Sequence, residues 1–352
     1  MTYSYRIYIN TMKKVTIYIL FLILLVFLIP IFFTKKNKIQ NNEYNSLRSI
    51  ESNKSTENNN GNINQENYDY KEYNKVKLLH NDTNKIEELD LDTYLLGVVS
   101  SEMPANFEIE ALKAQAVVAR TYTVFKIKNG VKHKIADICD DPSCCQAWIS
   151  KKDRLNKWKK EERDNNWSKI ENAVNSTKGK IITYKKEPIN AFFHSNSGGI
   201  TETASNVWGG DDYPYLKAIE TSGEDEYNQY RSEVIVTKEE FIDKIKEHHN
   251  NFKIDFNKKD QLKILEYTEG KRIKKIKIGN LYLSGVEIRN IFKLKSANFI
   301  IDIKNNKIKF NVIGYGHGVG MSQTGANSMA KDGKNYEEII RHYYSGVDIV
   351  DM

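Results

Sequence analysis

The sequence lacks the signatures of several common protein classes. No internal repeat is evident, and the one glycine-rich block, at 314–326, lacks the Gly-Lys-Ser/Thr ending of a phosphate-binding loop. No nucleic-acid-binding module is recognisable, so nucleic acid is not an expected partner. Cysteine is scarce as well, because only three occur in 352 residues and all three lie within seven positions.

One long hydrophobic run lies near the N-terminus. Residues 15–33 are 19 consecutive uncharged and almost wholly apolar positions, enough to cross the roughly 30 Å hydrocarbon core of a bilayer. We expect a transmembrane helix over 15–33, preceded by a short cytoplasmic tail at 1–14. A cleavable signal peptide is the alternative, since Lys13 and Lys14 precede the run. The run is long for a signal peptide, however, and Pro30 stands among large residues where a small-residue cleavage site would be expected.

A polar segment separates this run from the folded part. Residues 34–75 are dominated by Asn, Glu, Ser and Lys, with too few apolar residues to offset the entropy lost on ordering. We expect a flexible linker there and a folded extracytoplasmic domain over 76–352. The formal net charge of +7 would suit an anionic polymer outside the cell. The basic block at 271–277 is predicted to be the solvated face of a strand or hairpin.

The order of elements in the folded domain predicts an α+β fold, because helices and strands are segregated rather than strictly alternating. Helices are expected over 91–103, then from an N-cap at Asn106 to Asn129, then in a charged, exposed insertion at 151–171. Arg120, in the middle of the second helix, should extend to the surface or pair with a carboxylate, and the first is favoured. The later elements are predicted as a hairpin turning at 186–188, strands at 262–267, 274–278, 299–303 and 308–313, and short helices at 285–292, 326–330 and 336–344.

Glu102 occupies an unusual position for a charged residue. It ends an apolar helix, and Leu95, Val98 and Glu102 fall on one stripe of that helix. Desolvation beside Val98 and the negative end of the helix dipole should both raise the pKa of Glu102. A carboxyl that keeps its proton near neutral pH is what a general acid requires. The alternative is a partly exposed glutamate at a frayed helix end.

A group of metal-ligand residue types follows the second helix. His133, Cys139, Cys144 and Cys145 could supply the four donors of a closed tetrahedral zinc site, which would brace the loop rather than activate water. For an extracellular domain the alternative is a disulfide from Cys139 to Cys144 or Cys145. We favour zinc.

Residues 191–210 have the composition of a sugar-binding loop. Ser, Asn and Thr side chains lie beside Trp208, and sugars present both apolar faces and hydroxyl groups to such a surface. His194 could also form a nucleophile pair with Ser195 or Ser197. That reading is disfavoured, because immediate neighbours on a strand point to opposite faces and no orienting acid is evident.

The glycine-rich block at 314–326 is the second candidate cleft segment. Its glycines permit close backbone approach or positive φ. His317 alone is more often structural than catalytic, but a glycine-flanked histidine followed by Ser322 and Gln323 fits a cleft wall.

Taken in order, these blocks resemble one known family. VVSSEMPANF with EALKAQAVVARTY, then FFHSNSGGITETASNVWG, then GHGVGMSQTGA with HYYSGVDI, are similar to the stage II sporulation protein D family over nearly all of 76–352. The resemblance implies a membrane-anchored lytic transglycosylase that cuts the MurNAc–GlcNAc bonds of peptidoglycan glycan strands during forespore engulfment, outside the mother-cell membrane. It also implies two partners: the stage II sporulation protein P amidase, which strips peptides from those strands, and stage II sporulation protein M.

The resemblance further implies roles for individual residues. Glu102 matches the family's catalytic acid, and the metal cluster matches a zinc-binding segment, with Cys144 where a relative can have histidine. Tyr315 stands where the family usually has tryptophan, which should preserve a stacking face. The candidates for binding substrate are Ser195, Trp208, Tyr315, His317 and Gln323.

A single carboxyl is compatible with this chemistry. Hydrolysing glycosidases normally use two carboxylates, whereas in lytic cleavage the C6 hydroxyl of the muramic acid attacks its own anomeric carbon, leaving 1,6-anhydromuramyl ends. Asp92 cannot be a local second carboxylate, because ten helical residues place it about 15 Å from Glu102 along the axis. The competing hypothesis is a non-catalytic peptidoglycan-binding protein that activates a cell-wall amidase, as relatives called amidase enhancers are thought to do.

Overall fold

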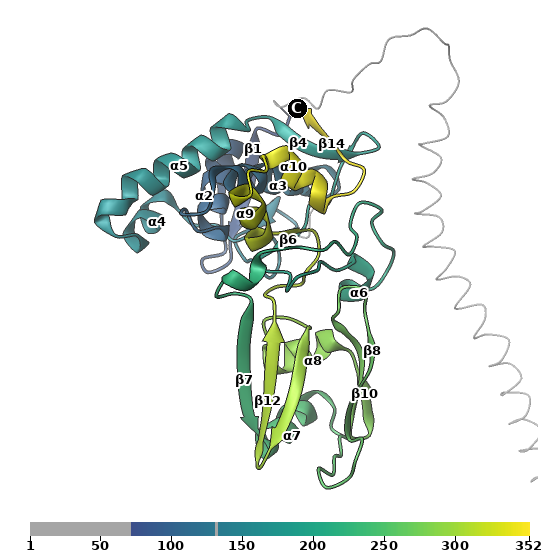
Figure 1. The fold of residues 1–352 in the computed structure, drawn as a ribbon. Helices are drawn as coiled ribbons and strands as arrows, with labels where there is room; N and C mark the ends of the chain where they lie inside the picture. The colour runs from purple at the N-terminus through teal and green to yellow at the C-terminus, as the bar shows by residue number, and fades with distance from the viewer. Residues whose placement is uncertain (1–71, 131–132) are drawn as a thin grey trace, which may run out of the picture. The chain divides into compact units, whose positions relative to one another are not determined.

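The computed structural model describes residues 72–130 and 133–352 (Figure 1). The expected tail, transmembrane helix and most of the linker lie outside these residues. Within them, no helix is both long enough and apolar enough to span a bilayer. The described part combines helices with short, mostly antiparallel sheets, so the expectation of a mixed helix-and-strand domain is confirmed.

A helical lobe is built around one long helix, α3 (Ile109–Lys128), of which 13 of 20 residues are buried. The helices α2 (Leu91–Glu102), α5 (Arg163–Ser176), α9 (Gln323–Lys331) and α10 (Tyr336–Tyr343) all contact it (Figure 1). Alanine, valine and threonine dominate the buried positions of α3, and such small side chains let several helices approach closely. The helix is therefore packed on several sides.

Short sheets and turns complete the helical lobe. Its two parallel pairs bring together segments far apart in the sequence. These are β1 (Lys75–His80) with β3 (Ile138–Cys139), and β6 (Phe193–His194) with β13 (Met321–Ser322). The remaining elements are β2 (Lys85–Asp90), α4 (Lys151–Lys157), η1 (Lys160–Glu162), β4 (Lys180–Tyr184), β5 (Glu187–Pro188), α6 (Ala204–Trp208), η2 (Glu224–Glu226) and β14 (Asp348–Asp351).

A strand-rich lobe, residues 231–313, has its own hydrophobic core. Phe241 and Phe310 lie in its centre, with Phe292 stacked on Phe241 at 5.1 Å between ring centroids. Two three-stranded sheets, β11-β12-β7 and β10-β9-β8, enclose this core together with two helices. The elements are β7 (Arg231–Thr237), α7 (Lys238–His248), β8 (Leu262–Tyr267), β9 (Ile273–Ile278), β10 (Leu281–Leu283), α8 (Gly285–Phe292), β11 (Phe299–Lys304) and β12 (Lys307–Ile313).

Three predictions about the helices are wrong, and the third concerns the Arg120 side chain. The second helix begins at Ile109 with Glu108 as its N-cap, because residues 105–107 first turn around Pro104, whose carbonyl accepts from the Phe107 amide at 3.0 Å. The insertion at 151–171 is helical but not wholly exposed, since Trp167 and Ile170 are buried against the core.

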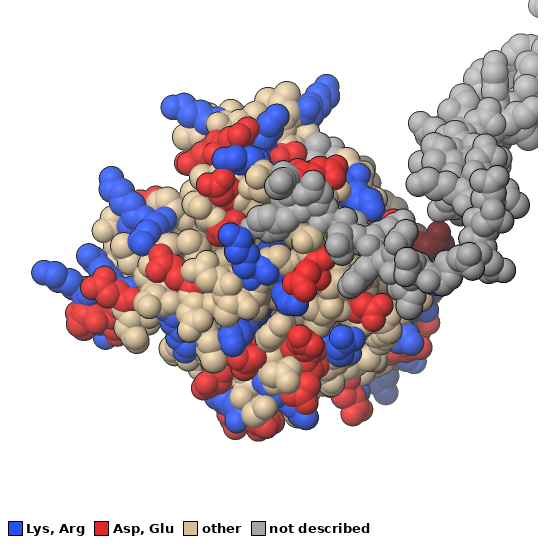
Figure 2. Space-filling view, turned by 90° about the horizontal axis from the view of Figure 1, so that it is seen from above, with Lys and Arg blue, Asp and Glu red and all other residues tan. Residues whose placement is uncertain are grey.

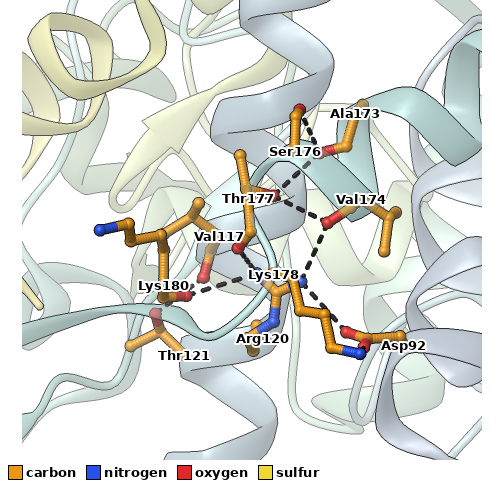
Figure 3. A network of polar contacts seen from close by, with 10 residues as sticks. All are labelled: Asp92, Val117, Arg120, Thr121, Ala173, Val174, Ser176, Thr177, Lys178 and Lys180. Carbon is orange, nitrogen blue, oxygen red and sulfur yellow. Dashed lines mark hydrogen bonds and ion pairs between the residues drawn. The ribbon is translucent and has the colours of Figure 1, made fainter. Parts of the chain in front are cut away.

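Arg120 does not extend to the surface. Its side chain is fully buried, and its guanidinium donates to the carbonyls of Thr177 at 2.8 Å and Lys180 at 3.3 Å, while lying 3.4 Å from Asp92 (Figure 3). A buried guanidinium is stable only when its donors are satisfied. The alternative expectation, that it pairs with a carboxylate, is therefore the one confirmed.

Candidate active site

Glu102 lies at the last residue of α2, and Met103 is already extended. Residues Leu95 and Val98 on the same stripe are fully buried, whereas the Glu102 side chain is only partly so. One carboxylate oxygen, Oε1, accepts a hydrogen bond from the backbone amide of Ala147 at 2.7 Å. The other, Oε2, lies 3.3 Å from the side-chain nitrogen of Gln323. The helix end is thus ordered by contacts with two distant segments rather than frayed.

The electrostatics of Glu102 agree in direction with the expectation from the sequence. Burial raises the pKa of this carboxyl above its usual value, and the hydrogen bonds from Ala147 and Gln323 lower it in part. The net raised pKa favours the protonated acid. The arrangement can therefore donate a proton at the end of α2 and stabilise the resulting carboxylate with two donors.

Gln323 is the predicted cleft residue that contacts Glu102. It is the first residue of α9, immediately after the parallel pair of β6 and β13. Its side chain is 6% exposed and also lies 3.4 Å from the side-chain oxygen of Gln115 on α3. The parallel strand pair explains how a residue 221 positions away in the chain reaches Glu102.

The position of Gln323 depends on a buried carboxylate that the sequence did not reveal. Glu224 is 1% exposed, and its two oxygens accept from the backbone amides of Ser197 and Gly199 at 2.8 Å each. The hydroxyls of Ser322 and Thr324, which flank Gln323, also donate to Glu224. Further donors are the hydroxyls of Ser197 and Thr221. Nothing in the local sequence TSGEDEY distinguishes this glutamate, because all its partners except Thr221 come from distant segments.

Trp208 and His317 belong to an aromatic group beside Phe192. The ring of Trp208 lies 4.6 Å from Phe192 and 5.1 Å from His317, and His317 lies 5.7 Å from His194. Trp208 is 52% exposed and, with Phe192 and Tyr213, lines an open groove of about 490 Å³. An exposed indole at a groove is suited to stacking on a sugar ring.

The two histidines of this group are neutral. Burial lowers the pKa of His194 to about 3 and lowers the pKa of His317 well below its ordinary value. His194 is hydrogen-bonded to the Val319 carbonyl, and the Ser197 hydroxyl is bound to Glu224. The considered nucleophile pair of His194 with Ser195 or Ser197 is therefore not formed.

The remaining predicted sugar-binding residues, Ser195 and Tyr315, lie on the loops of this site without a contact to Glu102 in the described structure. The carbonyl of Ser195 accepts from the Thr324 amide at 3.1 Å. Tyr315 is 42% exposed, and its ring lies 4.6 Å from the Lys295 ammonium. Tyr315 therefore faces solvent at the border between the helical and strand-rich lobes.

Gly318 and Arg272 join the glycine-rich block to the strand-rich lobe. A Cβ at Gly318 would lie 2.0 Å from the Arg272 guanidinium, so only glycine fits, and its φ of +87° favours glycine as well. The Arg272 side chain is 3% exposed and donates to the carbonyls of Ser197 and Ile200. The prediction that block 271–277 is a solvated face is thus wrong at Arg272, which holds the loop that begins at Ser197.

The four predicted metal ligands come together in space. The ligand atoms of His133, Cys139, Cys144 and Cys145 all lie within 4.8 Å of one another. His133 Nε2 is 3.6 Å from the sulfurs of both Cys144 and Cys145, which are 3.8 Å apart. Tetrahedral zinc with Zn–S of about 2.3 Å and Zn–N of about 2.0 Å requires a sulfur–sulfur separation of about 3.8 Å and a sulfur–nitrogen separation of about 3.6 Å. The cluster can therefore hold a metal, and all three cysteines are free thiols rather than disulfides.

The metal cluster and Glu102 are linked through a short loop. Ala147, whose amide donates to Glu102, is two residues after Cys145. The following residue, Trp148, packs on α2 so closely that a Cβ at Gly97 would lie 2.2 Å from the indole nitrogen. Gln146, which lies between Cys145 and Ala147 in the chain, donates to the hydroxyls of Tyr94 and Thr123 at 3.1 Å each. Bracing the cysteine-rich loop therefore fixes a hydrogen-bond donor of the candidate acid.

The geometry defines a class of protein: a mixed helix-and-strand domain with a partly buried glutamate between a cysteine-rich loop and a glycine-rich loop. The family described as stage II sporulation protein matches residues 79–184, and a family described as a domain of unknown function matches 219–320. The chain is 38% identical to stage II sporulation protein D of Bacillus subtilis (strain 168) over 266 residues, 75% of each chain. It is 36% identical to that of Bacillus amyloliquefaciens over 277 residues, 78% of each.

The chain therefore belongs to the stage II sporulation protein D family, as its sequence motifs suggest. It is also similar to a protein named amidase enhancer from Bacillus subtilis (strain 168), at 26% identity over 312 residues. That match covers 72% of this chain and 40% of the relative. The sporulation family and the amidase enhancer are thus related through this domain.

Proposed function

We propose that the protein is a lytic transglycosylase that cleaves the MurNAc–GlcNAc bonds of peptide-stripped peptidoglycan glycan strands during sporulation. The observation that carries the proposal is the position of Glu102: a carboxyl of raised pKa, held by two donors from different segments. A group of this kind can act first as an acid and then as a base.

In the proposed reaction Glu102 donates its proton to the glycosidic oxygen, and the bond from that oxygen to the anomeric carbon breaks. The C6 hydroxyl of the same muramic acid then forms a bond to that carbon and returns its proton to Glu102. No water is consumed, so one carboxyl is sufficient. Asp92 lies at the other end of α2 and is held by Arg120 and Lys178, which supports the assignment of both proton transfers to Glu102.

The substrate-binding role is proposed for the residues around the groove and the glycine-rich loop. Trp208 offers an exposed ring, and Gln323 fixes the carboxylate. His317 is neutral, partly buried and in ring contact with Phe192, so we propose that it shapes the wall of the substrate site. Ser195 and Tyr315 are proposed as further sugar contacts on the same loops.

We propose that the metal is zinc and that its role is structural. Its ligands would be His133, Cys139, Cys144 and Cys145, four donors with no position left for water. Zinc, when bound, would supply the cross-link that fixes the loop carrying Ala147. The proposed location is outside the mother-cell membrane, attached by a span over 15–33. Stage II sporulation protein P and stage II sporulation protein M are the proposed partners.

The test is incubation of the full-length protein with peptide-free glycan strands, followed by mass spectrometry. Products ending in 1,6-anhydromuramic acid, lighter by one water than hydrolysis products, are expected from the wild type and not from Glu102→Gln. The absence of such ends, or equal activity of Glu102→Gln, would refute the assignment.

The relationship to an amidase enhancer supports one second candidate, a non-catalytic activator of a cell-wall amidase. This function predicts stimulation of a partner amidase that survives Glu102→Ala. Glu102→Gln in the cleavage assay and Glu102→Ala in the amidase assay therefore distinguish the two candidate functions.

A further inference from the structure

The positive charge of the protein is concentrated in the strand-rich lobe. Residues 231–313 contain 19 Lys and Arg against 11 Asp and Glu, whereas the other positions contain 34 against 35. The net charge of +7 for the whole chain is thus more than accounted for by this lobe. The face shown in Figure 2, in contrast, carries basic and acidic side chains interspersed. A concentrated charge of one sign attracts a polymer of the opposite sign.

The β10-β9-β8 sheet of this lobe has one apolar and one basic face. The strand register pairs Ile276 with Leu283 and Ile264, and such residues point into the core. The alternate positions place Tyr282 opposite Lys277, and Lys277 opposite Lys263. Because neighbouring strands are about 4.8 Å apart, this row extends about 10 Å across the sheet. We call Lys263, Lys277 and Tyr282 the basic row.

Lys263 and Tyr282 of the basic row are exposed, Lys277 between them is partly exposed, and the row is only weakly neutralised. Tyr282 is 61% exposed, and the Lys275 ammonium lies 5.1 Å from the centre of its ring. The only carboxylate within 4 Å of Lys263 in the described residues is Asp260, at 3.9 Å, and both side chains are more than half exposed. Lys277 takes part in no ion pair among residues 72–130 and 133–352.

One ion pair and a second tyrosine lie near the row but outside it. Glu266, opposite Lys275 in the register, is bound to Lys274 at 2.7 Å, so it does not neutralise Lys275 directly. Tyr267 at the end of β8 is 55% exposed, but it pairs with Ile273, which is buried in the core, so Tyr267 lies outside the basic row. The face thus combines ammonium groups on β8 and β9 with the phenol ring of Tyr282 on β10.

We propose that the basic row is a binding surface for the anionic glycan strand, separate from the candidate active site at Glu102. The proposal rests on the proposed function for the identity of the polymer. Removal of stem peptides from muramic acid exposes a lactyl carboxylate on alternate sugars, and these carboxylates suit lysines. The apolar faces of the rings suit Tyr282. The surface would hold a long strand on the strand-rich lobe while another part of it occupies the cleft.

The experiment measures binding of peptide-free glycan strands to the full-length protein in the Glu102→Gln background, so that strands stay intact. The test variant carries Lys263→Gln, Lys277→Gln and Tyr282→Ala. The control carries Lys304→Gln, Lys307→Gln and Tyr267→Ala, which removes the same charge and one exposed tyrosine from the same lobe. Each of the three lost contacts should weaken binding by a factor of about two, so the basic-row variant should bind about eight-fold more weakly. Its binding should also depend less on salt.

Equal affinity of the test and control variants would overturn the proposal. Binding that is unchanged when the lactyl carboxylates are converted to amides would also overturn it, because a different anionic wall polymer or stacking alone would then be the target. Loss of binding to anionic lipid vesicles, with strand binding retained, would assign the row to the membrane instead.

Failure of the proposed function would be seen separately. If no 1,6-anhydromuramyl ends form but the basic row still controls strand binding, the surface stands and the reaction does not. The same test and control substitutions are then made in protein that keeps Glu102. If such ends form equally from short fragments with both variants, while only the test variant is slower on long strands, both proposals are supported.

Discussion

Replacement of Arg120 by methionine should be the most informative test of how the helical lobe is held together. Arg120 on α3 links the C-terminal turn of α5 and the start of β4 to Asp92 on α2 (Figure 3). Methionine keeps an unbranched apolar stem but removes every donor. The last carbonyls of a helix lack intrahelical partners. Without the guanidinium, the Val174 carbonyl would keep only the Thr177 amide at 3.3 Å and the Thr177 hydroxyl at 3.2 Å, and the Thr177 carbonyl would keep only the Lys180 amide at 3.1 Å.

The cost follows from the contacts that are lost. The short bond to the Thr177 carbonyl has a charged donor and contributes about 2 kcal/mol, whereas the longer bonds to Val174 and Lys180 contribute about 0.5 kcal/mol each. Asp92 is 20% exposed and keeps Lys178 as a partner, so loss of the ion pair costs little more. The sum is about 3 kcal/mol, at the lower end of the cost of breaking a buried ion pair. For a domain of this size it should lower the Tm by about 6 °C.

The assay is urea unfolding of the full-length protein, followed by tryptophan fluorescence. Lys178→Met is the control, because Lys178 pairs with the same Asp92 but is 62% exposed and should cost less than about 1 kcal/mol. If both variants lost the same small free energy of unfolding, the cost of burying the guanidinium would cancel its contacts and the reasoning would be refuted.

Three further predictions concern the candidate site. Gln323→Ala should move the basic limb of the pH–activity profile to higher pH: its hydrogen bond lowers the pKa of Glu102, and activity is lost as pH rises through that pKa. An unmoved limb would show that Gln323 does not act on the acid. Glu224→Gln should move the basic limb to higher pH by the same amount. The double variant Glu224→Gln with Gln323→Ala should move it no further than either single variant, which a double-mutant cycle would measure. Elemental analysis of protein purified under reducing conditions should find about one zinc per chain. Chelation should lower both activity and Tm, and full activity of metal-free protein would contradict the bracing role.

Many elements could be predicted from local signals. The apolar strand at β8 and the helix α8 agree with prediction in both bounds. The Asn305-Asn306 turn joins β11 to β12, and Asn305 has the positive φ that such a turn requires. By contrast, β2 has no buried residue, so its sequence lacks the alternation of apolar and polar residues from which a strand is predicted. The helix α7 has a capping box from Thr237 to Glu240, a signal that was present and missed.

The candidate site could be predicted only in part. Some of its residues stand out from their local sequence, whereas others are recognisable only from contacts with distant segments. Glu102 conflicts with its own apolar helix, and the metal ligands are clustered in sequence, so both were visible locally. Glu224 lies in a polar segment in which a charged residue is ordinary. The residues around Arg120 on its helix do not indicate that Asp92 is its partner. Buried charges whose partners come from distant segments are specified by the fold alone.

The two donors of Glu102 have independent supports, and this separates what each contributes. Ala147 is held by the cysteine-rich loop, which packs on α2 through Trp148 and Gly97. Gln323 is held through Ser322 and Thr324 by Glu224, in the other half of the chain. Because hydrogen bonds to a carboxylate stabilise its charged form, either support can lower the pKa of Glu102 without the other. Loss of the metal and loss of Glu224 should therefore shift the basic limb of the pH profile in the same direction and by amounts that add.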